Sequence, residues 1–160
     1  MTLDGAVTTQ TTVDINSGGE LTQNAKVTVG TSLDYDAGGT LTINETIGTT
    51  ARVDIDATGV TTVAEAGDIT SGGAVTFGAN KSGTLTTAGE ITTSNDNVTF
   101  TNAVTQSGDV SIDTGSGAGN ILFKSTVATA DKNLSLDAGS SGDITAASSI
   151  TGGGTMTVVD

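Results

Sequence analysis

Aspartates recur at a fixed interval near the start of this chain, and their carboxylates are the groups best suited to do chemistry. The phrases "VDINSGG", "LDYDAGG" and "VDIDATG" begin 20 residues apart. Hard cations such as Ca²⁺ bind several carboxylate and carbonyl oxygens at once. The candidate calcium ligands are therefore Asp14, Asp34, Asp36, Asp54 and Asp56.

A second interpretation assigns these acids no ligand. The phrases "DYDAGG" and "DIDATG" match neither the glycine-aspartate calcium nonapeptide nor the helix-loop-helix calcium loop. Each acid lies between apolar residues, so it points outward when they point inward. An outward charged row keeps an exposed sheet soluble and prevents aggregation. We favour this interpretation and expect no bound cofactor, with calcium as the alternative.

Stacked carboxylates repel one another. Two like charges about 5 Å apart repel by roughly 1 kcal/mol in water, and by several times that near a protein surface. Residues 1–70 hold ten acids and only two bases, Lys26 and Arg52. Arg52 can pair with Asp54, but we expect the protein's own bases to leave most of these acids unneutralised.

Catalysis is not expected. The chain has no histidine and no cysteine, which removes the commonest general base and the thiol nucleophile. Carboxylate pairs alone can hydrolyse glycosides. However, the turns are short and repetitive, and a pair such as Asp34 and Asp36 is better explained as a turn feature.

The composition excludes two classes of partner. The net charge is −13, so we expect no nucleic-acid partner, because phosphate binding needs basic patches. No run of about 20 apolar residues occurs, so we expect no membrane insertion. The opening "MTLDGAVTTQ" lacks the features of a signal peptide, and a secretion signal would have to lie outside this sequence.

Internal repeats organise the whole chain. Residues 1–70 follow a period of 20, and residues 71–160 follow a period of about 23. In the second part, all three phenylalanines form one column, Phe77, Phe100 and Phe123. We expect residues 1–160 to form one repeat block that belongs to a longer array or fibre.

The alternation of apolar and polar residues within each unit has a period of two, which predicts β-strands. Each unit holds about three short strands separated by Gly, Asn, Asp and Ser. The fold class predicted is an all-β parallel β-solenoid of about 7–8 coils, right-handed as parallel crossovers usually are. An antiparallel sandwich is the alternative, but it does not require identical columns at a fixed period.

A solenoid also predicts its partners. Its ends expose strand edges, so we expect end-to-end stacking with neighbouring copies or repeats.

Two stretches carry a resemblance to a known family. They are "NVTFTNAVTQSGDVSIDTGSGAGNILFKSTV" and "NLSLDAGSSGDITAASSITGGGTMTVVD". In rhythm and composition they resemble the repeats of giant bacterial surface adhesins and filamentous-haemagglutinin-like proteins. The resemblance implies an extracellular or cell-surface β-helix that acts as a stalk, adhesive fibre or matrix component, with cell-surface glycans as further partners.

Three functional hypotheses follow. The first is a structural or adhesive module of an extracellular bacterial surface protein or fibre. The second is a β-helix module that binds a ligand, either calcium or carbohydrate. The third is a β-helix enzyme that acts on polysaccharides.

Overall fold

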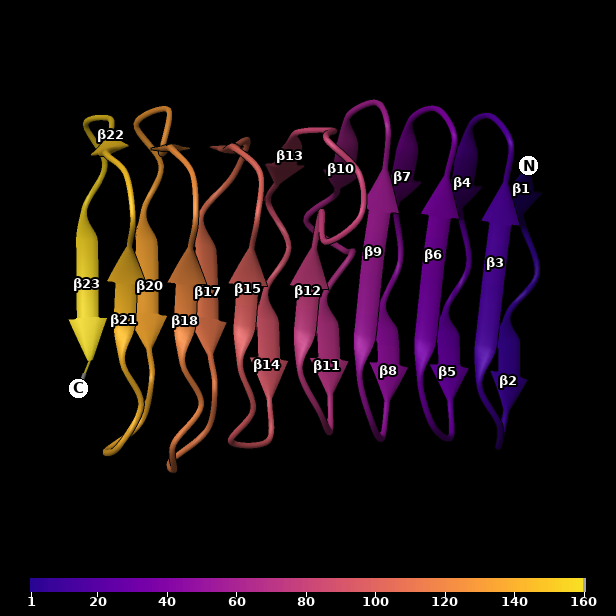
Figure 1. Ribbon diagram of the computed structural model, residues 1–160, viewed down its shortest axis with the longest axis horizontal. Helices are drawn as coiled ribbons and strands as arrows, with labels where there is room; N and C mark the ends of the chain where they lie inside the picture. Colours follow the sequence, from indigo (N-terminus) through magenta and orange to yellow (C-terminus); the bar gives the residue numbers. More distant parts are fainter. Residues whose placement is uncertain (160) are drawn as a thin grey trace.

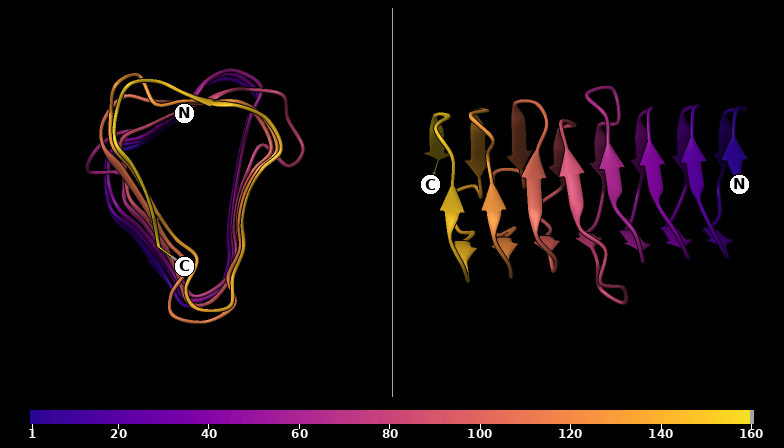
Figure 2. Two further views of the ribbon diagram at one scale, coloured as in Figure 1. Left: turned by 90° about the vertical axis from the view of Figure 1, so that its left-hand side faces the viewer. Right: turned by 90° about the horizontal axis from the view of Figure 1, so that it is seen from above.

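The protein is an all-β parallel solenoid, as the repeats predict. The computed structural model describes residues 1–159, which form 23 strands in three parallel sheets. Successive coils lie side by side along the long axis (Figure 1), and seen end-on they superpose as a triangle (Figure 2). These residues form no helix, and thus none long and apolar enough to span a membrane.

Each coil contributes one strand to each sheet. Sheet A contains β1 (Thr2–Leu3), β4 (Leu21–Gln23), β7 (Leu41–Ile43), β10 (Thr61–Val63), β13 (Leu85–Thr87), β16 (Val104–Gln106), β19 (Val127–Ala128) and β22 (Ile150–Thr151). Sheet B contains β2 (Val7–Thr9), β5 (Val27–Val29), β8 (Ile47–Thr49), β11 (Ile69–Ser71), β14 (Ile91–Thr93), β17 (Val110–Asp113), β20 (Leu134–Asp137) and β23 (Met156–Val159). Sheet C contains β3 (Val13–Ser17), β6 (Leu33–Ala37), β9 (Val53–Ala57), β12 (Val75–Phe77), β15 (Val98–Phe100), β18 (Ile121–Phe123) and β21 (Ile144–Ala146).

The strand register confirms the predicted columns. Val75 pairs with Val98, Val98 with Ile121, and Ile121 with Ile144. The inward members of such columns are buried, or partly buried near the ends of the rod as at Ile144, while the residue between them faces outward, as strand alternation requires. Neighbouring strands in a sheet lie about 4.8 Å apart. Each coil therefore packs its apolar side chains directly on those of the next.

The phenylalanine column is the clearest of these ladders. The ring centroids of Phe77 and Phe100 lie 5.3 Å apart, and those of Phe100 and Phe123 lie 4.7 Å apart. The rings are close to parallel, with interplanar angles of 6° and 8°. All three side chains are buried, so this stack is part of the core.

One polar residue in the core is fully bonded. Gln23 interrupts an otherwise apolar column, and its side-chain amide donates to the carbonyls of Ala25 at 3.1 Å and Glu45 at 2.9 Å. The hydroxyl of Tyr35 donates to the Gln23 Oε1 atom at 3.2 Å from the opposite wall of the same coil. Burial raises the pKa of Tyr35 above its ordinary value, so the phenol remains a donor.

The repeat period changes because the turns change length, while the strands remain in register. Leu41 pairs with Thr61, 20 residues on, but Ile47 pairs with Ile69, 22 residues on. The offset from Thr61 to Leu85 is 24, because residues 78–84 form a longer loop between sheets C and A.

Asp and Asn side chains join successive coils at the strand starts. On sheet C, the Oδ1 atom of Asn97 accepts from the backbone amide of Asn120 at 2.8 Å, and that of Asn120 accepts from Asp143 at 2.7 Å. On sheet B, Asp68 accepts from the amide of Glu90 in the same way. Each acceptor belongs to the earlier coil, so these contacts all have one direction along the rod.

The phenylalanine stack predicts where the core is most sensitive. Phe100 lies between two other rings and is 1% exposed, so Phe100→Ala should destabilise the protein by about 3–5 kcal/mol. Urea unfolding followed by circular dichroism measures this loss. The neighbouring Thr99→Ala, on the outward face, should change the unfolding free energy by less than about 0.5 kcal/mol. Equal losses for the two variants would contradict the stacked core.

Candidate functional site

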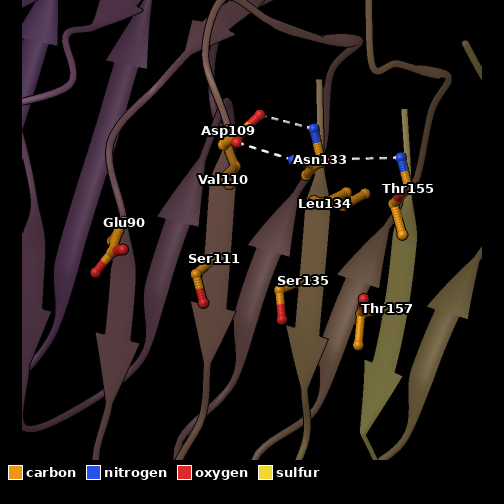
Figure 3. Close-up of a pocket in the computed structure, with 9 residues that line it drawn as sticks. All are labelled: Glu90, Asp109, Val110, Ser111, Asn133, Leu134, Ser135, Thr155 and Thr157. Atoms are coloured by element: carbon orange, nitrogen blue, oxygen red, sulfur yellow. Dashed lines mark hydrogen bonds between the residues drawn. The ribbon is translucent and has the colours of Figure 1, made fainter. Parts of the chain in front are cut away.

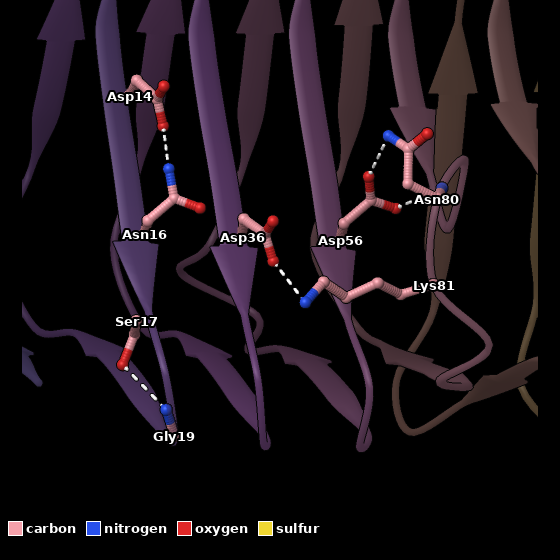
Figure 4. A network of polar contacts seen from close by, with 8 residues as sticks. All are labelled: Asp14, Asn16, Ser17, Gly19, Asp36, Asp56, Asn80 and Lys81. Carbon is pink, nitrogen blue, oxygen red and sulfur yellow. Dashed lines mark hydrogen bonds and ion pairs between the residues drawn. The ribbon is translucent and has the colours of Figure 1, made fainter.

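The five predicted aspartates lie together on the outward face of sheet C. Register places Asp14 beside Asp34 and Asp34 beside Asp54, which forms the first row. In the second row, Asp36 lies between Asn16 and Asp56. The rows run across β3, β6 and β9, so strand alternation and the 20-residue period bring the carboxylates together as the sequence predicts. Figure 4 draws Asp14 of the first row and Asn16, Asp36 and Asp56 of the second.

The two ends of the first row have partners within the protein. The Oδ1 atom of Asp14 accepts a hydrogen bond from the Asn16 side-chain amide at 2.7 Å. Asp54 forms an ion pair with Arg52, as its position two residues away predicts.

Asp34 lies between them, and its ionised carboxylate is the one that the surroundings disfavour. Its partial burial raises the pKa of its carboxyl above the ordinary value, and the neighbouring Asp14 charge raises it further. Arg52 lowers this pKa, and Asp56 and Asp36 raise it. The net shift is upward, so ionised Asp34 costs folding free energy.

A loop contacts two residues of the second row, Asp36 and Asp56, and buries Asp56. Residues 78–84, here called the strap, follow β12 and reach back over β9 to β6 (Figure 4). The Lys81 ammonium lies 2.6 Å from the Asp36 carboxylate. The backbone amide and side chain of Asn80 donate to the two carboxylate oxygens of Asp56, at 3.1 and 2.8 Å. Asp56 is consequently only 3% exposed.

The strap is itself held in place from both sides. The Gly83 amide donates to the Ala57 carbonyl at 3.0 Å, and the Asn102 side chain donates to the Lys81 carbonyl at 2.6 Å. Gly78 has a φ of +71°, a conformation that favours glycine, where the chain leaves β12. A Cβ at Gly83 would collide with the Gly59 carbonyl oxygen, so glycine is required there too.

The expectation that the protein's own bases leave these acids unneutralised is wrong for Asp36. Counting charges within residues 1–70 missed Lys81, which reaches back across two coils. The expectation of an outward, solvated side chain is likewise wrong for Asp56, because the strap buries it. The only sequence signal for this cover is the longer interval between Phe77 and Leu85, which carries Asn80 and Lys81.

The structure leaves the calcium hypothesis a prediction. Asp36 and Asp56 are already bonded to donors from the strap, so a cation there would have to replace Lys81 and Asn80. Within residues 1–159, no group of three or more acidic side chains is arranged to hold a metal ion. The row formed by Asp14, Asp34 and Asp54 is where a calcium test should look.

A polar groove lies on sheet B, away from these acids (Figure 3). It has a volume of about 450 Å³. Its floor is a row of hydroxyls in register, Ser111 beside Ser135 and Ser135 beside Thr157. Glu90 and Asp109 add carboxylates to its lining.

One side of the groove is fixed by side-chain bonds between coils. The two carboxylate oxygens of Asp109 accept from the backbone amide and side chain of Asn133, at 2.8 and 2.9 Å. These bonds hold the pKa of Asp109 below its usual range. Asn133 in turn accepts from the amide of Thr155 at 3.2 Å. Sequence reasoning missed this groove, although an Asp or Asn directly before a strand, as in "DVSI" and "NLSL", was its signal.

The shifted pKa of Asp34 predicts a pH effect. The folded protein holds the Asp34 proton more tightly than the unfolded chain does, so stability from this group falls as pH rises through the raised pKa. Asp34→Asn should therefore raise the melting temperature at pH 7. The gain should vanish well below pH 3.8, the unperturbed value, where the carboxyl is neutral in both states. Thermal melts across this range measure the effect.

The same variant tests calcium. For the pH experiment the control is Asp143→Asn, an exposed change directly before the distant strand β21, which should not raise the melting temperature at pH 7 comparably. If the first row binds calcium, Ca²⁺ will raise the melting temperature of the wild type and a chelator will lower it, and Asp34→Asn will respond less. If neither Ca²⁺ nor a chelator changes the melting temperature of the wild type, the calcium hypothesis is contradicted and solubility is left as the role of the row.

Comparisons with protein-family models, curated proteins and solved structures find no match to this chain. What the protein does is therefore inferred from its coils and side chains.

Proposed function

We propose that this chain is a structural module, a stiff repetitive stalk of an extracellular bacterial surface protein or fibre. The observation that supports it is the unbroken strand order. Sheets A and B each run through eight strands and sheet C through seven, always between adjacent coils. A rod built this way resists bending, because bending would break backbone hydrogen bonds and inner packing along one wall.

Packing supports the same proposal. A single coil cannot bury its apolar face alone, so stability comes from the interfaces between neighbouring coils. The aliphatic and phenylalanine columns continue through these interfaces, and the strand-start Asp and Asn bonds reinforce them from outside. Such a module transmits force and holds its two ends at a fixed separation. No catalytic step is part of the proposal.

The partners proposed are neighbouring repeats or copies that continue the same ladders. The inward positions of β23 support this proposal. Met156 and Val158 pair with Leu134 and Leu136, which are buried, yet they are themselves about half exposed, at 49% each. Another coil stacked in register would bury them as β23 buries β20.

A distance measurement between two spin labels tests the stalk. The chain has no cysteine, so Thr22→Cys and Thr151→Cys give two unique sites in one outward column of sheet A. Six strand spacings separate β4 from β22, so electron-electron resonance should give a narrow distribution centred at about 29 Å. A broad distribution would show a flexible chain and would contradict the stalk.

The Thr22→Cys single variant tests stacking separately. Head-to-tail copies would place equivalent labels eight strand spacings apart, about 38 Å, with an amplitude that grows with protein concentration. The absence of this distance at every concentration would contradict stacking between copies and leave the stalk itself unaffected.

The groove on sheet B favours a second candidate, carbohydrate binding. Its row of hydroxyls repeats at the strand spacing, and hydroxyls both donate and accept hydrogen bonds, as sugars require. The carboxylates of Glu90 and Asp109 favour neutral or amino sugars over acidic ones. Among the described residues that line the groove none is aromatic, so binding would depend mainly on hydrogen bonds.

Oligosaccharide titration tests this second candidate. Chitosan and cellulose oligomers should shift the amide resonances of Ser111 and Ser135, and polygalacturonate should not. Ser135→Lys, which places a long cationic side chain in the groove, should abolish the shifts. Thr105→Lys, an outward change on sheet A, should leave them unchanged. Equal responses from the two variants, or none from the wild type, would contradict a site in this groove.

A further inference from the structure

Three buried oxygens in one inner column lack hydrogen-bond partners among residues 1–159. They are the Oγ1 atom of Thr87, the Oε1 atom of Gln106 and the Oγ1 atom of Thr129. Thr87 pairs with Gln106 in register, and Thr129 directly follows the next pair, Thr105 with Ala128. The three side chains therefore stack in consecutive coils, each at most 5% exposed.

The same column contains a second buried glutamine, Gln23, whose Oε1 atom does have a donor. Register carries it from Gln23 through Ile43, Val63 and Thr87 to Gln106. Both glutamines use the side-chain amide alike. Gln23 donates to the carbonyl two residues on, and Gln106 does so to Gly108 at 3.4 Å, with a second bond to Asn133 at 3.0 Å. The two Oε1 atoms thus occupy equivalent places in their coils.

The difference lies on the opposite wall. Tyr35 supplies the hydroxyl that satisfies Gln23. Its column continues through Ile55, Phe77 and Phe100 to Phe123, which belongs to the coil of Gln106. Phenylalanine has no hydroxyl, so Gln106 receives no donor from that wall.

The column of Thr87, Gln106 and Thr129 is here called the polar seam. We propose that it is an internal water site, in which one water bridges Thr87 and Gln106 and a second bridges Gln106 and Thr129. Buried polar atoms in proteins nearly always have a partner, and ordered water is the usual one when side chains supply none. The three side chains stack at the strand spacing, and no hydrogen bond joins their oxygens directly. A water molecule has two donor hydrogens, so it can donate to the oxygens of two neighbouring side chains at once.

Water in the polar seam would supply the hydrogen bond that Phe123, which has no hydroxyl, does not give to Gln106. Each bridge would bond two neighbouring coils from within, as the Asp and Asn bonds do from outside. This inference concerns the interior and is independent of the proposed stalk function.

Magnetisation transfer from water, measured by nuclear magnetic resonance, tests the proposal. In the wild type, the Gln106 side-chain amide and the Thr87 and Thr129 methyl groups should show cross-peaks whose sign marks water held for longer than nanoseconds. The Gln23 amide should show none, because Tyr35 fills its site. Missing cross-peaks at all three residues, with their resonances observed, would overturn the proposal.

Two matched variants exchange the sites. Phe123→Tyr should donate to Gln106, as Tyr35 does to Gln23, and should remove the Gln106 water cross-peak. Tyr35→Phe should create a water cross-peak at Gln23 and lower the melting temperature. A folded Phe123→Tyr protein that retains the Gln106 cross-peak would overturn the bridging geometry. Stabilisation specific to Na⁺ or K⁺ would assign an ion in place of water and also overturn the proposal.

Discussion

Parallel stacking in register is the constraint on which the rest of the structure depends. Because each strand pairs with its equivalent in the next coil, each side chain lies about 4.8 Å from the residue in the same position one coil on. Like therefore meets like. For valine and phenylalanine this builds a core from a chain that is only 34% hydrophobic. For aspartate it creates repulsion, and where a buried column is polar it stacks the oxygens of Thr87, Gln106 and Thr129 without hydrogen-bond partners among the described residues.

Features that depend on period alone could be predicted from the sequence. The apolar columns, the phenylalanine stack and the two acidic rows all follow from alternation and a repeat length, and the structure places them as expected. Features that depend on contacts between unlike positions far apart in the sequence could not. Lys81 reaches back two coils to Asp36, and Tyr35 reaches across the core to Gln23. Neither partner shares a column with its target, so no count of repeats reveals the pair.

These unlike contacts are also where the molecule departs from a uniform rod. The strap is held over one corner of sheet C, the groove is confined to part of sheet B, and the polar seam occupies three coils of sheet A. The proposed stalk needs none of them, because unbroken ladders suffice. They are instead the positions at which the coils differ from one another. Carbohydrate binding is proposed at the groove, and the internal water site is proposed at the polar seam.

The strap has a consequence for how the chain finds its alignment. Columns of similar residues allow a folding chain to slip by one whole coil while it keeps most of its contacts, and repeat proteins misassemble in this way. The strap removes that degeneracy. Displaced by one coil toward the N-terminus, it would set Asn80 over Asp36 and Lys81 over Asn16, an uncharged amide, so the ion pair would be lost. The asparagine at the head of the second row thus distinguishes the observed alignment of the strap from the one displaced by a coil toward the N-terminus.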